Sequence, residues 1–422
     1  MTVTQVPHVA FVSLGCRVNR VETDRIVGEL RASGCEVVGE REAQAIIINT
    51  CAVTGEAEAK TRKAVRHAAS LAQRPLVVAT GCVANLFADE LTSIADNVII
   101  ETEKGQVARR VLDELQISGE LLPAVESLTP TATGRTRPGV KVQDGCDLRC
   151  TYCIVWKARG RSRSVAPDEV VAQVLEACRQ GAPEVVLTGI NLGRYQANSN
   201  EGELLLPDLI ELLLDKTDVG RLRLSSIEPQ DVDERLADVI VSSEGRVAPF
   251  LHMCLQSGCD ATLRRMGRVY DTKLFAERLA MVRERLPHAS FGTDLIVGFP
   301  GETEGEFVES LRFCEEARFS RMHIFRYSKR PGTRAAEMDG QVSPIVSARR
   351  AAQMHDLATA MRLAEAQSLV GTRDRVVVQA PGIGVTGGLF DAVLEKTVPV
   401  GALVDVQVTG YCDDATLVCS CV

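Results

Sequence analysis

The chain has 422 residues, enough for two or three domains with cores of their own. Its net charge of −8 excludes a surface that attracts nucleic acid everywhere, so contact with a polyanion requires a local basic patch. No apolar run approaches the roughly 20 residues of a membrane helix, and the first residues carry no secretory signal. We therefore expect a cytoplasmic protein whose 14 cysteines bind metal, act in catalysis or pack in cores rather than form disulfides.

The first region alternates short apolar runs with helical patterns. The predicted strands are residues 8–14, 45–49, 76–79 and 98–100, and helical patterns follow the first three. Strands that alternate with helices predict a parallel or largely parallel α/β sheet.

Three cysteines of this region, Cys16, Cys51 and Cys82, each follow the carboxyl end of a predicted strand. Open α/β sheets place their sites at that edge, so the three loops can converge although they are distant in sequence. We expect the three thiolates to hold an iron–sulfur cluster. The alternative is three small residues in tight loops between strand and helix.

A linker separates this region from the next. Residues 120–138 lose helical and strand periodicity and collect Pro, Thr and Gly. We place the first domain at residues 1–120 and the linker at 121–138.

The second domain opens with a predicted strand at 140–143, which leads directly into Cys146, Cys150 and Cys153. Three thiolates in a C-x3-C-x2-C pattern can all reach one small inorganic group. A [4Fe–4S] cluster usually takes four cysteines, so three would leave one iron open to a ligand that is not protein. The alternative is three neighbouring buried cysteines, and the charged neighbour Asp147 argues against that.

The second domain, residues 139–370, repeats strand and helix at regular intervals. The predicted strands are residues 140–143, 184–188, 221–225, 250–256, 291–297 and 321–327. Six such units predict an open, partial TIM-type barrel, whose chemistry belongs at the carboxyl ends of its strands. Gly189, Glu228 and Gln256 all fall at those ends.

The last 52 residues, 371–422, have a different pattern. A helix predicted at 344–370 leads into short Val-rich runs that alternate with Gly, which predicts a small β-barrel or sandwich.

Several motifs of the chain resemble one enzyme family. The run CDLRCTYC (146–153) resembles the signature of radical S-adenosylmethionine (SAM) enzymes, and the contexts SLGC, NTCAVT and TGC around the first three cysteines resemble the N-terminal domain of the methylthiotransferases. The similarity covers nearly the whole chain. The segments most similar to the branch that modifies N6-threonylcarbamoyladenosine at tRNA position 37 are NTCAVT (49–54), ARGRSRS (158–164), LTGINLGRY (187–195), RLSSIEP (223–229) and DLIVGFPGE (294–302).

This resemblance implies two [4Fe–4S] clusters and SAM as cofactors. Cys146, Cys150 and Cys153 would hold the cluster that cleaves SAM to a radical. The other three cysteines would hold an auxiliary cluster that carries the sulfur. The product would be a methylthio group at C2 of the adenine, an unactivated position for which the cofactor must supply the reactivity. One SAM would donate the methyl group and another would be the radical source.

The resemblance also bears on smaller sites and on partners. We expect Gly189, Glu228 and Gln256 to contact SAM, and no catalytic side chain beyond the cluster ligands. The partners implied are a tRNA substrate, an electron donor such as flavodoxin or ferredoxin, and a source of sulfur. We expect a monomer, because no feature of the sequence requires an oligomer. We also expect no contact with a membrane.

A basic run beside the three-cysteine motif suits an RNA substrate. Lys157, Arg159, Arg161 and Arg163 occur with no acidic residue among them, and guanidinium groups bind phosphate in a fork geometry. The alternative is a solvated loop, and Trp156 is read as a packing residue in preference to a base-stacking one. The C-terminal domain resembles the TRAM RNA-binding module, but it carries three basic residues against six acidic ones and is therefore expected to bind phosphate poorly.

Two other functions remain open. The sister branches of the family act on N6-isopentenyladenosine in tRNA or on an aspartate of a ribosomal protein. A function of another class is a non-catalytic iron–sulfur carrier or sensor that binds RNA.

Overall fold

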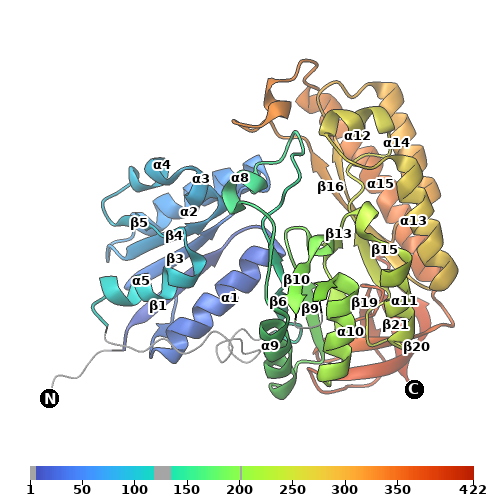
Figure 1. Ribbon diagram of the computed structural model, residues 1–422, viewed down its shortest axis with the longest axis horizontal. Helices are drawn as coiled ribbons and strands as arrows, with labels where there is room; N and C mark the ends of the chain where they lie inside the picture. Colours follow the sequence, from blue (N-terminus) through green and yellow to red (C-terminus); the bar gives the residue numbers. More distant parts are fainter. Residues whose placement is uncertain (1–5, 118–134, 200–201) are drawn as a thin grey trace. The chain divides into compact units, whose positions relative to one another are not determined.

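The computed structural model describes residues 6–117, 135–199 and 202–422 (Figure 1). The chain folds into two compact units. Of the described residues, the first comprises 6–117, Asp144–Leu148 and Cys153–Ser162. The second comprises Arg135–Gln143, Arg149–Tyr152 and Arg163–Val422. Most of the expected linker, 121–138, lies outside the described residues.

The first unit contains a parallel five-stranded sheet with strand order β2-β1-β3-β4-β5, as the alternating pattern predicted. Its strands are β1 (His8–Ser13), β2 (Glu36–Val37), β3 (Ala45–Thr50), β4 (Leu76–Gly81) and β5 (Val98–Ile100). Its helices are α1 (Arg17–Ala32), α2 (Gly55–Ala69), α3 (Cys82–Leu86), α4 (Ala88–Thr92), α5 (Val107–Glu114) and α8 (Val155–Arg159), with the 3-10 helix η1 (Lys104–Gln106).

Strand β3 lies at the centre of this sheet and is buried along its whole length. Alternate side chains of a strand point to opposite faces, so Ile46 and Ile48 pack in the core cluster that contains Val65 of α2. Ile47 packs in the opposite cluster, which contains Leu30 of α1. Helices cover both faces of the sheet, which explains the continuous apolar run in place of an alternating one.

Helix α8 comes from the three-cysteine segment but belongs to the first unit. It packs against α3, and Ala158 of α8 and the preceding residue Ile154 lie in the same core cluster as Val83. A short stretch of the second expected domain is therefore anchored in the core of the first sheet.

The second unit contains the expected partial barrel of six principal parallel strands. These are β6 (Gly139–Lys141), β9 (Glu184–Thr188), β12 (Arg221–Leu224), β14 (Phe250–Met253), β15 (Ser290–Val297) and β16 (Arg321–Arg326). They form the sheets β12-β9-β6 and β13-β14-β15-β16, with β13 (Ser226–Ile227) beside β14. The covering helices are α9 (Pro167–Arg179), α10 (Leu206–Lys216), α11 (Glu234–Ser242), α12 (Asp260–Met266), α13 (Thr272–Arg285) and α14 (Glu304–Ala317).

Strand β14 is shorter than expected. The strand ends at Met253, and Gln256, the last residue of the predicted strand, has a φ of +66°, in the left-handed region rather than the extended one. Only an isolated bridge between Gln256 and Leu295 continues the pairing with β15.

The remaining short elements of this unit lie in its loops. They are β7 (Gln143–Asp144), which continues into the first unit, β8 (Arg163–Ser164), β10 (Gln196–Ser199), β11 (Gly202–Leu205), η2 (Leu192–Arg194), η3 (Pro229–Asp231) and η4 (Arg334–Glu337).

The C-terminal region is a closed five-stranded barrel, so the structure decides between the two β folds that the sequence left open. Helix α15 (Pro344–Ser368) precedes β17 (Arg373–Ala380), β18 (Ile383–Val385), β19 (Asp391–Leu394), β20 (Leu403–Tyr411) and β21 (Leu417–Cys421). The barrel closes in the order β17-β18-β19-β21-β20. None of the helices within the described residues combines the length and apolar character that crossing a membrane requires.

Candidate metal centre

Cys16, Cys51 and Cys82 lie at the carboxyl ends of β1, β3 and β4, which are neighbours in the first sheet. Cys16 is the N-cap of α1, Cys51 directly follows β3, and Cys82 is the first residue of α3. The structure therefore places all three at one edge of one sheet, where parallel strands bring their loops together.

The thiols of Cys16 and Cys51 interact directly. Cys51 donates a hydrogen bond that lowers the pKa of Cys16 to about 6, against the opposing effect of burial. The same interaction, together with burial and the nearby Cys82, raises the pKa of Cys51. The backbone N–H of Val53 donates to the Sγ of Cys51 at 3.3 Å. One thiol of the pair thus ionises readily, as a metal ligand must.

Gly15 permits this approach. It has a φ of +90°, and a Cβ at this position would lie 2.1 Å from both the Cβ and the Sγ of Cys51. Only glycine satisfies both conditions at once.

One side-chain amide and one hydroxyl connect the three cysteine loops. Asn19 donates from Nδ2 to the carbonyls of Leu14 (3.0 Å) and Thr50 (2.7 Å). The Oγ1 of Thr50 accepts from the N–H groups of Val83 (3.1 Å) and Ala84 (3.0 Å) at the start of α3. The loops after β1, β3 and β4 are therefore held by bonds within the first unit.

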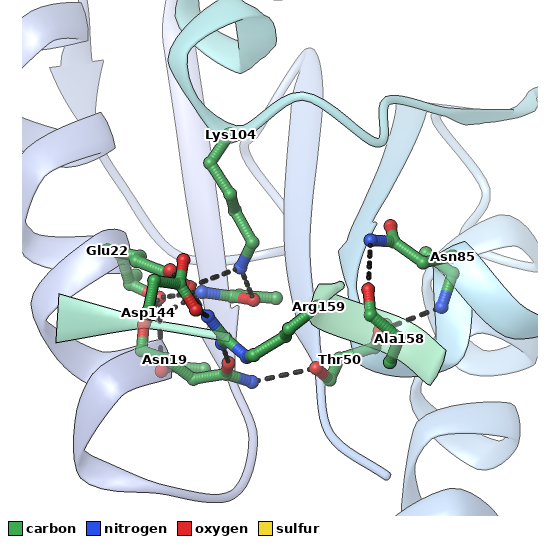
Figure 2. Close-up of polar contacts among 12 residues, drawn as sticks. Asn19, Glu22, Thr50, Asn85, Lys104, Asp144, Ala158 and Arg159 are labelled. Atoms are coloured by element: carbon green, nitrogen blue, oxygen red, sulfur yellow. Dashed lines mark hydrogen bonds and ion pairs between the residues drawn. The ribbon is translucent and has the colours of Figure 1, made fainter. Parts of the chain in front are cut away.

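Arg159 lies buried in an ion-pair network beside these loops (Figure 2). Its guanidinium contacts Glu22 through both carboxylate oxygens (2.9 and 3.1 Å), the Oδ1 of Asp144 (2.9 Å) and the Oδ1 of Asn19 (2.6 Å). Burial alone would lower the pKa of Arg159, but the charges of Glu22, Cys82 and Asp144 raise it well above its ordinary value. The side chain is a fixed cation.

The expectation that Arg159 contacts RNA is therefore wrong. The sequence pattern places it among surface arginines, but packing of α8 against α3 turns this side chain inward. The other members of the basic run differ from it. Arg161 has a 93% exposed side chain, Arg163 is exposed, and the Nζ of Lys157 lies 5.3 Å from the ring centroid of the half-buried Trp156.

Lys104 from η1 completes the network. Its Nζ lies 2.7 Å from a carboxylate oxygen of Glu22 and 2.5 Å from the Oδ1 of Asn49, two residues before Cys51. Burial lowers the pKa of Lys104, and Glu22 opposes that shift.

The cysteines of the second set belong to different units. Cys146 and Cys153 lie in segments of the first unit, and Cys150 lies in a segment of the second. Within the second unit, the buried Arg268 donates from Nη1 to the Sγ of Cys150 at 3.0 Å and forms an ion pair with Glu228. Its guanidinium carbon also lies 4.8 Å from the ring centroid of Tyr270.

The three residues expected to contact SAM all follow barrel strands. Gly189 directly follows β9 and packs against Gln143. A Cβ on Gly189 would lie 2.9 Å from the Oε1 of Gln143. Glu228 follows β13 and pairs with Arg268, and Gln256 has the left-handed backbone described above. Their contact with SAM stays a prediction.

The sequence did not lead us to predict a cluster of polar side chains on the barrel strands, formed by His252, Cys254, Asp294 and His323. The Nε2 of His252 lies 3.2 Å from the Oδ1 of Asp294, and a nitrogen of His252, the Sγ of Cys254 and a carboxylate oxygen of Asp294 lie within 4.8 Å of one another. The ring of His323 stacks on His252 at 5.6 Å between centroids. The signal was present: these residues alternate with the core residues Leu251, Met253 and Leu295, and therefore occupy the other face of the same strands.

The donor sets fit iron–sulfur clusters. Thiolates are the ligands that such clusters use, and the first set gathers three thiols, one with a depressed pKa, next to the cations Arg159 and Lys104. In the second set, a guanidinium already donates to the Sγ of Cys150, as hydrogen bonds to cluster sulfurs do.

Comparison with known proteins agrees with this chemistry. Residues 140–314 match the Radical SAM superfamily, and residues 8–101 match the Uncharacterized protein family UPF0004. The threonylcarbamoyladenosine tRNA methylthiotransferase MtaB of Bacillus subtilis (strain 168) is 35% identical over 359 residues, which cover 81% of this chain and 78% of that protein. The tRNA-2-methylthio-N(6)-dimethylallyladenosine synthase of Leifsonia xyli subsp. xyli is 34% identical over 385 residues, 88% of this chain and 71% of that protein.

Among solved structures, the radical S-adenosylmethionine methyltransferase TsrM from Kitasatospora setae has a TM-score of 0.57 at 14% identity, and the match covers 90% of this chain and 78% of that one. This likeness supports the fold. The sequence relatives decide the family: the chain belongs to the radical SAM methylthiotransferases.

Proposed function

We propose that this enzyme inserts a methylthio group at C2 of N6-threonylcarbamoyladenosine in tRNA, next to the anticodon. One SAM donates the methyl group and another is the radical source. The observation that carries the proposal is the gathering of Cys16, Cys51 and Cys82 at one sheet edge, in a chain whose relatives include an MtaB that is 35% identical. A radical enzyme that only cleaves SAM needs one set of three cysteines, and this chain has two.

Each set of cysteines would hold one [4Fe–4S] cluster. Cys146, Cys150 and Cys153 would hold the cluster at which SAM binds, and the other set would hold the auxiliary cluster. When bound, the two clusters supply the electron for SAM cleavage and an open iron for sulfur.

The chain's own residues perform binding and orientation. Gly15 leaves room for the Sγ of Cys51, and Thr50 holds the start of α3 at Cys82. Arg159 and Lys104 place positive charge near the anionic thiolates of the first set. Arg268 does the same for Cys150.

The exposed part of the basic run would contact the tRNA. Lys157, Arg161 and Arg163 are the members that we propose, because the guanidinium of Arg159 is engaged inside the first unit. An electron donor such as flavodoxin or ferredoxin and a source of sulfur would be the protein partners. We propose that the reaction takes place in the cytoplasm and that the enzyme is a monomer.

The experiment that tests the substrate is mass spectrometry of tRNA nucleosides from a strain that lacks the gene. We expect loss of the methylthio form of threonylcarbamoyladenosine and its return on complementation. Complementation with a Cys51→Ala variant should fail. If the deletion instead removes the methylthio form of isopentenyladenosine, the substrate is that of the sister branch. The 34% identity to a dimethylallyladenosine synthase is the reason to consider this alternative.

The cofactor proposal is tested on the purified chain. Anaerobic reconstitution should yield about eight irons per chain. Cys146→Ala should abolish SAM cleavage, whereas Cys51→Ala should retain cleavage and lose sulfur insertion. A chain that forms no 5′-deoxyadenosine from SAM under reducing conditions would instead be a non-catalytic carrier or sensor.

A further inference from the structure

We propose that Arg159 is a positioning residue that, within the first unit, sets the spacing between Cys146 and Cys153 and the three cysteines of the sheet. Through Glu22 and Asp144, it holds the segments that carry Cys146 and Cys153 against the sheet that carries Cys16, Cys51 and Cys82. This inference rests on the proposed function, because spacing between two clusters matters only if sulfur transfer is coupled to radical formation.

The first support is the number of segments that meet at one guanidinium. Arg159 ends α8, Asn19 and Glu22 come from α1, and Asp144 lies just before Cys146. Glu22 is 137 positions from Arg159 in the sequence. A planar guanidinium fork can make all four of these hydrogen bonds at once, to both oxygens of Glu22, to Asp144 and to Asn19, whereas a lysine ammonium has only three N–H donors.

The second support is that the segment has another attachment on the far side of α8. The Nδ2 of Asn85 in α3 donates to the carbonyl of Ala158 at 2.9 Å (Figure 2). Ile154 and Ala158 are buried in the core that contains Val83. Helix α8 is therefore held by apolar packing and by the backbone bond at Ala158, and Arg159 supplies the polar attachment to α1.

The third support is the continuity between this attachment and the cysteine loops. Asn19, which accepts from Arg159, also donates to the carbonyl of Thr50 next to Cys51. Lys104 shares Glu22 with Arg159 and donates to Asn49. A shift of the guanidinium would therefore disturb the loop of Cys51 as well as the loop of Cys146.

The charges also argue for a rigid contact. Arg159 contacts both Glu22 and Asp144, Lys104 also contacts Glu22, and Arg159 and Glu22 are both nearly inaccessible to solvent. Removing one member reduces the compensation of a buried charge, which is unfavourable. Such a network has one well-defined geometry, as a positioning device requires.

The test compares Arg159→Gln, Arg159→Lys and Glu22→Gln in the full, anaerobically reconstituted chain. The matched control is Arg110→Gln, because Arg110 also pairs with a glutamate in the first unit (Glu114, 2.9 Å) but on an exposed helix surface. For each variant we would measure iron content, the ratio of 5′-deoxyadenosine to methylthio product, and hydrogen exchange of the peptides that span 144–162.

We expect Arg159→Gln and Glu22→Gln to retain both clusters and SAM cleavage. Because the cysteine groups lose their fixed spacing, the ratio of 5′-deoxyadenosine to product should increase about tenfold or more. Hydrogen exchange in 144–162 should accelerate while α2 and α5 remain as protected as in the parent. Arg159→Lys should recover part of the product, and Arg110→Gln should match the parent.

Unchanged exchange in 144–162 would overturn the attachment, and faster exchange with an unchanged product ratio would overturn the positioning role. If Arg159→Gln does not fold, Arg159→Lys and Glu22→Gln decide the same two outcomes. Failure of the proposed function looks different: the parent chain would then make no methylthio product from any tRNA. In that case the exchange data and the spin–spin broadening between the two reduced clusters, seen by electron paramagnetic resonance, decide the proposal. Broadening that is equal in the parent and in Arg159→Gln would overturn it.

Discussion

Gly15 and Cys51 lie so close together that a Cβ on the glycine would be 2.1 Å from the Sγ of the cysteine. Gly15→Ala should therefore displace Cys51 and prevent binding of the proposed auxiliary cluster without affecting the proposed cluster at Cys146, Cys150 and Cys153. We expect iron content to fall from about eight to about four per chain, with SAM cleavage retained and methylthio product lost.

Gly34→Ala is the matched control for this prediction. Gly34 has nearly the same φ (+86°), but a Cβ there would meet no atom within 4 Å. Both variants carry the left-handed backbone penalty, on the order of 1–2 kcal/mol. Equal iron loss in the two variants would mean that backbone strain, and not the contact with Cys51, is responsible.

The contact between Arg268 and Cys150 gives a prediction about electron transfer. Arg268 donates to the Sγ of Cys150. If Cys150 holds the SAM-binding cluster, as proposed, this donor would stabilise the reduced, more negative state of the cluster. Arg268→Gln should therefore lower the midpoint potential of the SAM-binding cluster, on the order of 50 mV if part of a charged hydrogen bond is lost. A redox titration followed by electron paramagnetic resonance measures this shift.

Arg268→Lys separates charge from geometry in that experiment. It keeps the positive charge near Cys150 and Glu228, so its potential should lie between those of the parent and Arg268→Gln. A potential that is unchanged in both variants would contradict a role for Arg268 at Cys150.

Glu184 gives a prediction about acid stability. Its carboxylate is fully buried between Arg221 (2.5 Å) and Arg223 (2.7 Å). Burial raises its pKa, but the charges of Arg223, Arg221 and Arg137 outweigh that effect and lower the pKa to about 2 from an ordinary 4.5. The depressed pKa means that Glu184 stabilises the fold above pH 4.5, and that this contribution, roughly 3 kcal/mol, is lost as the pH falls from about 4.5 to 2.

Glu184→Gln should remove that part of the pH dependence and lower the free energy of unfolding at pH 7 by about 3–5 kcal/mol, because two buried cations lose their partner. The C-terminal barrel should also become more sensitive to proteases, since Arg223 donates to the carbonyls of Thr386 and Gly387 in that barrel. Chemical denaturation at several pH values measures the effect. The surface variant Glu211→Gln should change stability by less than about 1 kcal/mol.

The exposed part of the basic run gives a prediction about tRNA affinity. Neutralising Lys157, Arg161 and Arg163 together should weaken tRNA binding. The slope of the logarithm of the binding constant against the logarithm of the salt concentration should become less steep, by the amount that corresponds to about two to three phosphate contacts. Neutralising three exposed basic residues elsewhere, Lys60, Arg110 and Arg312, is the control. An unchanged salt slope in the first variant would mean that the basic run does not contact tRNA and is an ordinary solvated loop.

Much of the architecture follows from local pattern. Continuous apolar runs such as residues 45–49 indicate strands covered on both faces, and their alternation with helical patterns leaves few arrangements besides a parallel sheet. The conformation of Gln256 just after β14 was less predictable, because a left-handed backbone is not a preference of glutamine and arises from its surroundings.

The sequence by itself determined which residues can act together when they are close along the chain or at the ends of adjacent strands. The C-x3-C-x2-C spacing and the three cysteines after predicted strands are of this kind. Only the tertiary structure decided which arginine of the basic run is buried. Arg159 and Arg161 look alike in sequence, but Arg159 meets Glu22 across 137 positions whereas Arg161 is solvated. Burial of a charge depends on a compensating partner brought by packing, and no local pattern specifies that partner.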